Sequence, residues 1–349
     1  MPPLSFNRRQ FIGALGTAML AGTWRPVHAA APRRVMTVKG WVHANELGNT
    51  LAHEHILVDF IGAAEVYPPR WDREAVIEAT MPYLEEVRNA GCQTIVDCTP
   101  NYLGRDVGLL RILSQRTGLH IITNTGYYGG SDEKFLPDHA LSESPQQLSA
   151  RWVAEWRDGI DGTPVKPGFI KTSVNNGPLS GISRKLIEAA CLTHLRTGLT
   201  IASHTGAGVA AVEQMDVLKA HKIDPSAFIW VHAQEEQDTD LHVTAAKEGA
   251  WISLDGLNDD NVDAYAQRIT YLRDQKCLDR ILVSHDAGWY DPEKPHEEQA
   301  IRGYTTIFRK LIPSLEQNGF NEPDIYRILH ENPVNAYSIA VRRWKKDRG

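Results

Sequence analysis

Cysteine is scarce in this sequence, because only four of its 349 residues are cysteines. None stands in a CxxC spacing, and all lie in apolar segments, so we interpret them as buried thiols: Cys92, Cys98, Cys191 and Cys277. This excludes a disulfide framework and a zinc knuckle. Basic charge is also in deficit, since 37 lysines and arginines face 43 acidic residues, and the net charge of -6 argues against a nucleic-acid or anionic-membrane partner.

The sequence has no uncharged apolar run long enough to cross a bilayer comfortably, and its nearest approach is Phe11 to Thr23. Arg8 and Arg9 precede this run, and small residues follow it. The pattern predicts that residues 1–31 are a signal peptide of the twin-arginine class. The expected partner is then the twin-arginine export machinery, and the expected location is periplasmic or secreted. A Sec signal and an uncleaved anchor are the alternatives.

After residue 50, short apolar runs alternate with amphipathic segments that have charges on one face. There are eight such runs: TLAHEHILVD, CQTIVDCTP, HIITNTGYY, GFIKTSV, TIASHTG, FIWVHAQ, WISLDGL and ILVSHDAG. Helical segments are expected between them, such as 73–91, 180–198 and 209–222. This alternation predicts an α/β fold, a (β/α)8 TIM barrel formed by residues 32–349 as one domain, with a doubly wound open sheet as the weaker option.

Residues 320–345 are expected to form extra helix, packed on the outside of the barrel or against its base. Basic residues gather at the end of this segment, and we interpret them as cations at the negative end of a helix dipole: Arg342, Arg343, Lys345, Lys346 and Arg348.

Ligand-type side chains stand near the carboxyl ends of five of the expected strands: His53, His55, Lys171, His204, His232 and Asp286. A barrel concentrates its chemistry at this face, so we expect all six to converge on one rim. The two-residue period of a strand predicts that one further residue in each run points inward with the ligand of its own strand: Leu51, Phe169, Ala202, Trp230 and Ser284. Four histidines with a carboxylate indicate a metal site.

The role of Lys171 decides between one metal ion and two. A protonated lysine has no lone pair, so Lys171 is either a counter-ion for Asp286 or chemically altered. If CO2 adds to the neutral amine, the resulting carbamate has two oxygens that can bridge two metal ions. A mononuclear site of the deaminase type has no such need.

At these residues the sequence resembles a known family. LAHEHI, the lysine of GFIKTS, SHTGAG, VHAQEEQDTD and LVSHDAGW are similar to motifs of the phosphotriesterase family of the amidohydrolase superfamily, which includes phosphotriesterase-like lactonases. The resemblance runs from about residue 36 to residue 336. It implies two divalent transition-metal ions, with zinc as the default and manganese, iron or cobalt as alternatives. It also implies a homodimer.

The resemblance further implies a division of roles among the ligands. His53, His55 and Asp286 would hold one metal ion, His204 and His232 the other, and carboxylated Lys171 with a hydroxide would bridge them. The hydroxide would attack the substrate, and Asp286 would pass its proton to the leaving group.

A tyrosine typical of the lactonases is present after the third run, where TGYYGG places Tyr128, or less favourably Tyr127, at the rim. Where the triesterases have a relay histidine and many lactonases an arginine, this sequence has Gly256, and Glu235 lies near the position of the relay acid. We expect further pocket residues in the loops: Trp71, Asn101, Asn175, Asn176, Trp289 and Tyr290. Arg302 and Lys185 are expected to be solvated or ion-paired rather than to bind substrate.

The sequence thus predicts an exported binuclear hydrolase that opens a lactone or carboxylic ester, with phosphotriester (organophosphate) hydrolysis as the main or a side activity. Two rivals stay open. A mononuclear aminohydrolase would use the same barrel and histidines, and a periplasmic binding protein without turnover would explain the missing relay residue.

Overall fold

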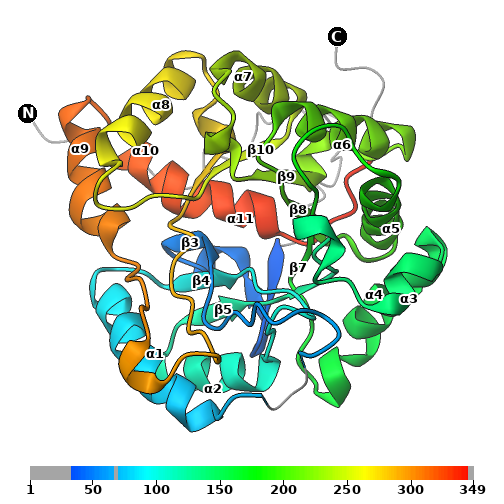
Figure 1. Ribbon diagram of the computed structural model, residues 1–349. Helices are drawn as coiled ribbons and strands as arrows, with labels where there is room; N and C mark the ends of the chain where they lie inside the picture. Colours follow the sequence, from blue (N-terminus) through cyan, green and yellow to red (C-terminus); the bar gives the residue numbers. More distant parts are fainter. Residues whose placement is uncertain (1–32, 67–69, 345–349) are drawn as a thin grey trace, which may run out of the picture. The chain divides into compact units, whose positions relative to one another are not determined.

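The computed structural model describes residues 33–66 and 70–344, which belong to one compact unit. The predicted signal peptide lies outside the described residues. A ring of helices surrounds the parallel strands of a barrel (Figure 1). None of the helices in the described ranges has the length and hydropathy to cross a membrane.

The barrel strands coincide with the eight predicted runs, and the third run is divided in two. Their bounds are β3 (Thr50–Glu54), β4 (Thr94–Asp97), β5 (His120–Ile122), β6 (Asn124–Thr125), β7 (Phe169–Ser173), β8 (Thr200–His204), β9 (Phe228–Val231), β10 (Trp251–Leu254) and β11 (Ile281–Val283). Neighbouring strands pair in parallel. The ring closes where the N–H of Asp286 donates to the carbonyl of His53 (3.1 Å). The prediction of a (β/α)8 barrel is confirmed.

The helices cover the strands on the outside. Their bounds are α1 (Arg73–Asn89), α2 (Val107–Thr117), α3 (Asp138–Ser142), α4 (Pro145–Asp158), α5 (Gly181–Thr197), α6 (Gly208–Ala220), α7 (Thr239–Glu248), α8 (Val262–Asp274), α9 (Ile312–Gln317), α10 (Glu322–Tyr326) and α11 (Asn332–Tyr337). Local signals set the ends: Ser180 caps α5 by accepting the N–H of Ser183, and Gly198 ends it with φ at +78°. The three helical segments predicted from the sequence are present.

Short helical turns join many of these elements. They are η1 (Ala44–Glu46), η2 (Ser131–Glu133), η3 (Ile160–Gly162), η4 (Pro225–Ala227), η5 (Ala233–Glu235), η6 (Leu278–Arg280) and η7 (His296–Glu298), and the π-helical segments η8 (Ile307–Leu311) and η9 (Arg327–Glu331) lead into α9 and α11.

The base of the barrel is sealed by both ends of the described chain. An antiparallel hairpin that the sequence analysis missed, β1 (Arg34–Thr37) and β2 (Gly40–His43), packs there. So does α11, whose Tyr337 hydroxyl donates to the carbonyl of Ala52 (2.8 Å). The extra helix predicted for 320–345 therefore ends early, at the base. Arg342 lies beyond this helix, and its guanidinium donates to the carbonyls of Asn335 and Ala336. The cation therefore binds at the carboxyl end of α11, although Arg342 is not part of the helix.

A buried histidine ties α5 to this last segment. His194 donates from Nδ1 to the carbonyl of Leu199 (2.8 Å), and its Nε2 accepts the N–H of Arg342 (2.9 Å). Burial lowers the pKa of His194 to about 4. The ring is therefore neutral at physiological pH, as its acceptor role requires.

The predicted alternation of side chains holds for Phe169 and Ala202, which pack in the cluster inside the barrel. It is wrong for Leu51 and Trp230, which pack outside, between strands and helices. A change of register between Leu51 and Glu54 breaks the two-residue period in β3. The exception at Trp230 has a different cause. His232, two residues later, has φ at +61°, in the left-handed region, and this turns the His232 side chain back to the barrel side.

Candidate metal centre

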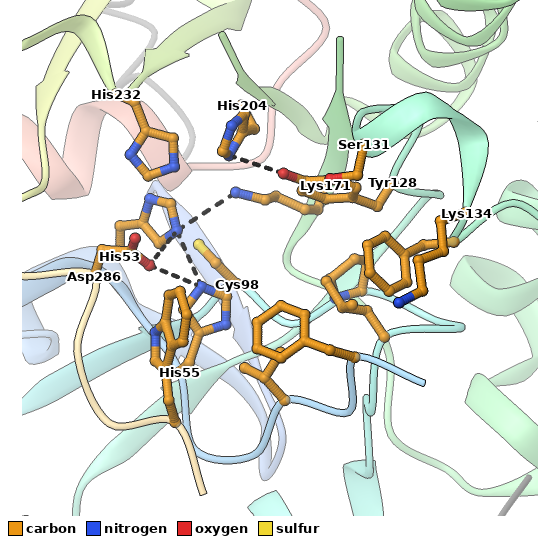
Figure 2. Close-up of a pocket in the computed structure, with 16 residues that line it drawn as sticks. His53, His55, Cys98, Tyr128, Ser131, Lys134, Lys171, His204, His232 and Asp286 are labelled. Carbon is orange, nitrogen blue, oxygen red and sulfur yellow. Dashed lines mark hydrogen bonds and ion pairs between the residues drawn. The ribbon is translucent and has the colours of Figure 1, made fainter. Parts of the chain in front are cut away.

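The structure brings all six predicted ligands together at the carboxyl ends of the strands (Figure 2). The Nε2 atoms of His53 and His55 lie 3.3 Å apart, and Oδ1 of Asp286 is 3.0 Å from Nε2 of His55. Nζ of Lys171 lies 3.5 Å from Nε2 of His53. The rings of His204 and His232 are 4.2 Å apart between centroids. The sites of two metal ions proposed from the sequence therefore share one pocket.

The surroundings of His53 and His55 favour the forms that bind metal ions. Nδ1 of His55 is 2.7 Å from the hydroxyl of Thr99, which donates to the carbonyl of Leu57 and so accepts from the imidazole. In a neutral His55 ring, Nε2 is then the unprotonated acceptor that faces the centre. Burial lowers the pKa of His53 to about 4, so the ring of His53 is neutral. Neutral imidazole is the form that binds metal ions.

Asp255 is a site residue that sequence reasoning missed. It is fully buried, and its two carboxylate oxygens lie 2.9 Å from Nδ1 of His53 and 2.7 Å from Nδ1 of His232. Burial opposes its ionisation, but the contacts with His232 and His53 hold the pKa of Asp255 well below its usual range. This carboxylate orients one histidine of each predicted metal pair. The sequence signal that could have identified Asp255 as a site residue is its position directly after β10, at the carboxyl end of a strand.

The donor set fits metal ions on its own chemistry. Two unprotonated nitrogens and a carboxylate face one another, and in the described part of the chain Oδ1 of Asp286 has no hydrogen-bond donor. Such a cluster of acceptors is unfavourable unless a cation lies among them. Lys171 is 2% exposed, and no carboxylate of the described residues forms an ion pair with it, which speaks against the counter-ion explanation. The family implied by the sequence is metal-dependent, and the residues fit that requirement.

Tyr128 stands in the pocket as predicted. Its hydroxyl lies 3.2 Å from Nδ1 of His204, and burial raises its pKa. Tyr127 points elsewhere, with its hydroxyl 3.0 Å from Nε2 of His139. Gly126 makes the arrangement possible, because its φ is +112° and a Cβ there would lie 2.1 Å from the carbonyl oxygen of Lys171. Of the two candidate tyrosines, Tyr128 is the one at the site.

The pocket is a cavity of about 300 Å³. Apart from the ligands and Tyr128, it is lined by Val58, Phe60, Cys98, Pro100, Leu103, Ser131, Lys134, Phe135 and Trp289. The size lies at the lower end of the usual range for small-molecule sites, about 300–1,000 Å³. A small substrate with an apolar body fits this lining.

The prediction of pocket residues in the loops is wrong for most of them, because only Trp289 among the six lines the cavity. The others lie outside its lining: Trp71, Asn101, Asn175, Asn176 and Tyr290. Trp71 is buried and donates to Asp106 (2.9 Å) instead.

The relay positions do not line the pocket either. The N–H of Gly256 donates to the hydroxyl of Tyr265 (2.7 Å), and Glu235 is outside the lining. Lys185 donates to the carbonyl of Leu141 (2.9 Å), and Arg302 lies over the ring of Trp289 (5.5 Å to the centroid). As expected, neither cation belongs to the pocket wall.

Comparisons with known proteins agree with this geometry. Residues 33–337 match the Phosphotriesterase family. A phosphotriesterase homology protein of Escherichia coli (strain K12) is 30% identical over 295 residues, which are 83% of this chain and 98% of that protein. An aryldialkylphosphatase of Saccharolobus solfataricus is 27% identical over 310 residues, 86% of this chain and 98% of that protein.

A solved structure supports the same assignment. A mutant organophosphorus hydrolase from Deinococcus radiodurans has a TM-score of 0.78 and 26% identity, and the match covers 88% of this chain and 98% of that one. Fold and site define a barrel hydrolase of the metal-dependent class. The chain belongs to the phosphotriesterase family, as the sequence motifs implied.

Proposed function

We propose that this protein is a binuclear metal-dependent hydrolase that opens a lactone or a similar carboxylic ester. The observation that carries the choice of substrate is the Tyr128 hydroxyl, 3.2 Å from a predicted metal ligand and within the pocket. The alkoxide that leaves a lactone has a high pKa and needs a proton, and a tyrosine hydroxyl at this place can donate to it.

The proposed ligands follow the two groups that the geometry supports. His53, His55 and Asp286 would hold one ion, and His204 with His232 the other. Lys171, carboxylated by CO2, would bridge them; its burial without a paired carboxylate supports this. Zinc suits a nitrogen-rich site, and manganese, iron or cobalt also suit it. When bound, two such cations make a water molecule acidic enough to act as the nucleophile.

The chain's own groups would handle the protons. Asp286, bound to a metal ion on one side, would accept the proton that the nucleophilic water gives up. Tyr128 would donate to, or pack against, the oxygen that leaves. Asp255 and Thr99 would keep the histidines oriented throughout.

Phosphotriester hydrolysis is the second candidate, because two of the similar proteins are named aryldialkylphosphatase and organophosphorus hydrolase. Metal analysis of the purified protein, followed by a screen of lactones, aryl esters and aryl phosphotriesters, tests both. We expect close to two metal ions per chain and faster turnover of lactones. One ion per chain would revive the mononuclear aminohydrolase, and no turnover of any substrate with both ions bound would favour a binding protein.

We also propose that the protein is exported by the twin-arginine route to the periplasm or the outside of the cell, and that it forms a homodimer. Replacing Arg8 and Arg9 by lysine should leave the precursor in the cytoplasm, whereas unimpaired export would indicate a Sec signal. Sedimentation of the mature protein measures the oligomeric state.

A further inference from the structure

The pocket wall contains a cation that the proposed chemistry does not use. Lys134 and Lys171 are the only lysines or arginines among the described residues that line the cavity. Lys171 lies among the histidines, whereas Lys134 lies on the far side of the pocket from His53 and Asp286 (Figure 2). The wall also includes Val58, Leu103 and Phe135, which form one buried apolar cluster. The pocket therefore has a reactive end, an apolar wall and a distal cation.

An unusual backbone turn places this lysine. Ser131, Asp132 and Glu133 all have positive φ, at +53°, +51° and +68°. Three consecutive left-handed residues are unfavourable for L-amino acids, and such strain persists only where surrounding contacts enforce it. Directly after this turn, Lys134 and Phe135 both line the pocket.

Close packing holds the turn against the barrel. The preceding Gly130 has no room for a side chain, because a Cβ there would lie 2.3 Å from Oγ of Ser173. On the other side, the N–H of Ala63 donates to the carbonyl of Lys134 (3.0 Å). The backbone around Lys134, in the loop that follows β6, is thus held between the end of β7 and the loop that follows β3.

The ammonium group is left without a counter-ion. No carboxylate of the described residues forms an ion pair with Lys134, and Nζ lies 5.6 Å from the ring centroid of Phe135. The side chain is exposed at the pocket, so water solvates it in the free protein. An oxyanion that entered along the apolar wall would gain an ion pair there without displacing an existing one.

We propose that Lys134 is a specificity-determining residue that selects substrates with an anionic oxygen group, such as a carboxylate, at the end of a short apolar body opposite the reacting ester. The reacting group would lie at the histidines, the apolar body along Val58, Leu103 and Phe135, and the anion at Lys134. This inference rests on the proposed ester or lactone hydrolysis.

A pair of esters that differ in the distal group tests the inference. We compare the kcat/KM of mono-4-nitrophenyl glutarate with that of 4-nitrophenyl pentanoate in metal-replete enzyme at low salt. Lys134→Met should lower kcat/KM for the glutarate ester by about three- to fivefold, the upper end expected for an exposed ion pair, and change that for the pentanoate ester less than about 1.5-fold. Lys134→Arg should keep the preference, and Lys134→Glu should reverse it.

Lys247→Met is the matched control, because Lys247 is an exposed lysine on α7 outside the pocket lining. The wild-type preference should also fall at high salt, since the pair is screened. An equal effect of Lys134→Met on both esters, or an equal effect of the control variant, would overturn the inference.

A binding measurement separates this result from failure of the proposed function. Calorimetric titration with pentane-1-sulfonate and pentan-1-ol needs no turnover. If neither ester is hydrolysed but the sulfonate binds more weakly to Lys134→Met than to wild type, the proposed reaction fails and the anion site stands. Equal sulfonate affinity in both proteins rejects the anion site.

Discussion

Replacing Asp255 by asparagine should weaken metal binding at both halves of the centre. The carboxylate accepts from Nδ1 of His53 with one oxygen and from Nδ1 of His232 with the other. An amide of the same shape can accept from only one of them, and its NH2 then faces the N–H of the second ring. One histidine therefore loses its orientation, or its ring turns over and presents the wrong nitrogen to the centre.

The expected loss follows from the number of contacts removed. Loss of a carboxylate that supports a metal-binding histidine typically costs 10- to 100-fold in metal affinity, about 1.4 to 2.7 kcal/mol. Asp255 supports two histidines, one in each proposed group, so we expect a loss in this range at each site. The hydroxyl of Ser253 also donates to Asp255 (2.8 Å), and Ser253→Ala should have a smaller effect of the same kind.

Chelator competition measures this loss, with the number of metal ions per chain followed as the chelator concentration rises. Circular dichroism first establishes that metal-free Asp255→Asn is folded. Asp263→Asn, which changes an exposed acidic residue on α8, is the matched control. If the folded Asp255→Asn variant retains both metal affinities within about threefold of wild type, the orienting role assigned to Asp255 is wrong.

Three further results are expected. Lys171→Ala should lose activity and recover part of it with short carboxylic acids, because a free carboxylate can occupy the place of the carbamate; normal turnover with two metal ions and no added acid would contradict this. Tyr128→Phe should slow lactone opening more than hydrolysis of a nitrophenyl phosphotriester, by about 1–3 kcal/mol, because only the lactone expels a poor leaving group; equal losses would reduce Tyr128 to pocket wall. In wild type, His194 binds a proton near pH 6.5 in the unfolded chain but only near pH 4 in the folded protein. Its contribution to the free energy of unfolding is therefore complete above pH 6.5 and is lost as the pH falls towards 4. Urea titrations of wild type should show a loss of stability between about pH 7.5 and pH 5, of which His194 accounts for about 2 kcal/mol. In His194→Gln this part of the loss should be absent, and an unchanged pH dependence would refute the reasoning.

The strands and the convergence of the proposed metal ligands could be predicted from the sequence because both follow from strong local signals. Parallel barrel strands are buried on both faces and read as apolar runs. The ligands stand where those runs end, as at His204 after TIAS and His232 after FIWV. The side-chain direction could not be predicted where the backbone departs from a regular strand, as at the register change after Leu51 and the left-handed His232.

The pocket wall was the least predictable part. Phe60, Leu103 and Lys134 stand in loops, where no periodicity indicates which side chains turn inward. Lys134 depends on a left-handed turn of non-glycine residues, which no composition rule would propose for Ser-Asp-Glu. Asp255 was visible at the end of a strand, but its role appears only when the two histidines it contacts are brought together.

The sealed base of the barrel has a consequence for synthesis on the ribosome. The N–H of Ile339 donates to the carbonyl of Arg34 (3.1 Å), so the first described strand bonds to a segment made about 300 residues later. At a translation rate of about 5–20 residues per second, the hairpin waits roughly 15–60 s for this partner. During that time Val35 and the inner barrel cluster lack the cover that Tyr337 gives them. The nascent chain therefore exposes an apolar floor to chaperones until α11 leaves the exit tunnel.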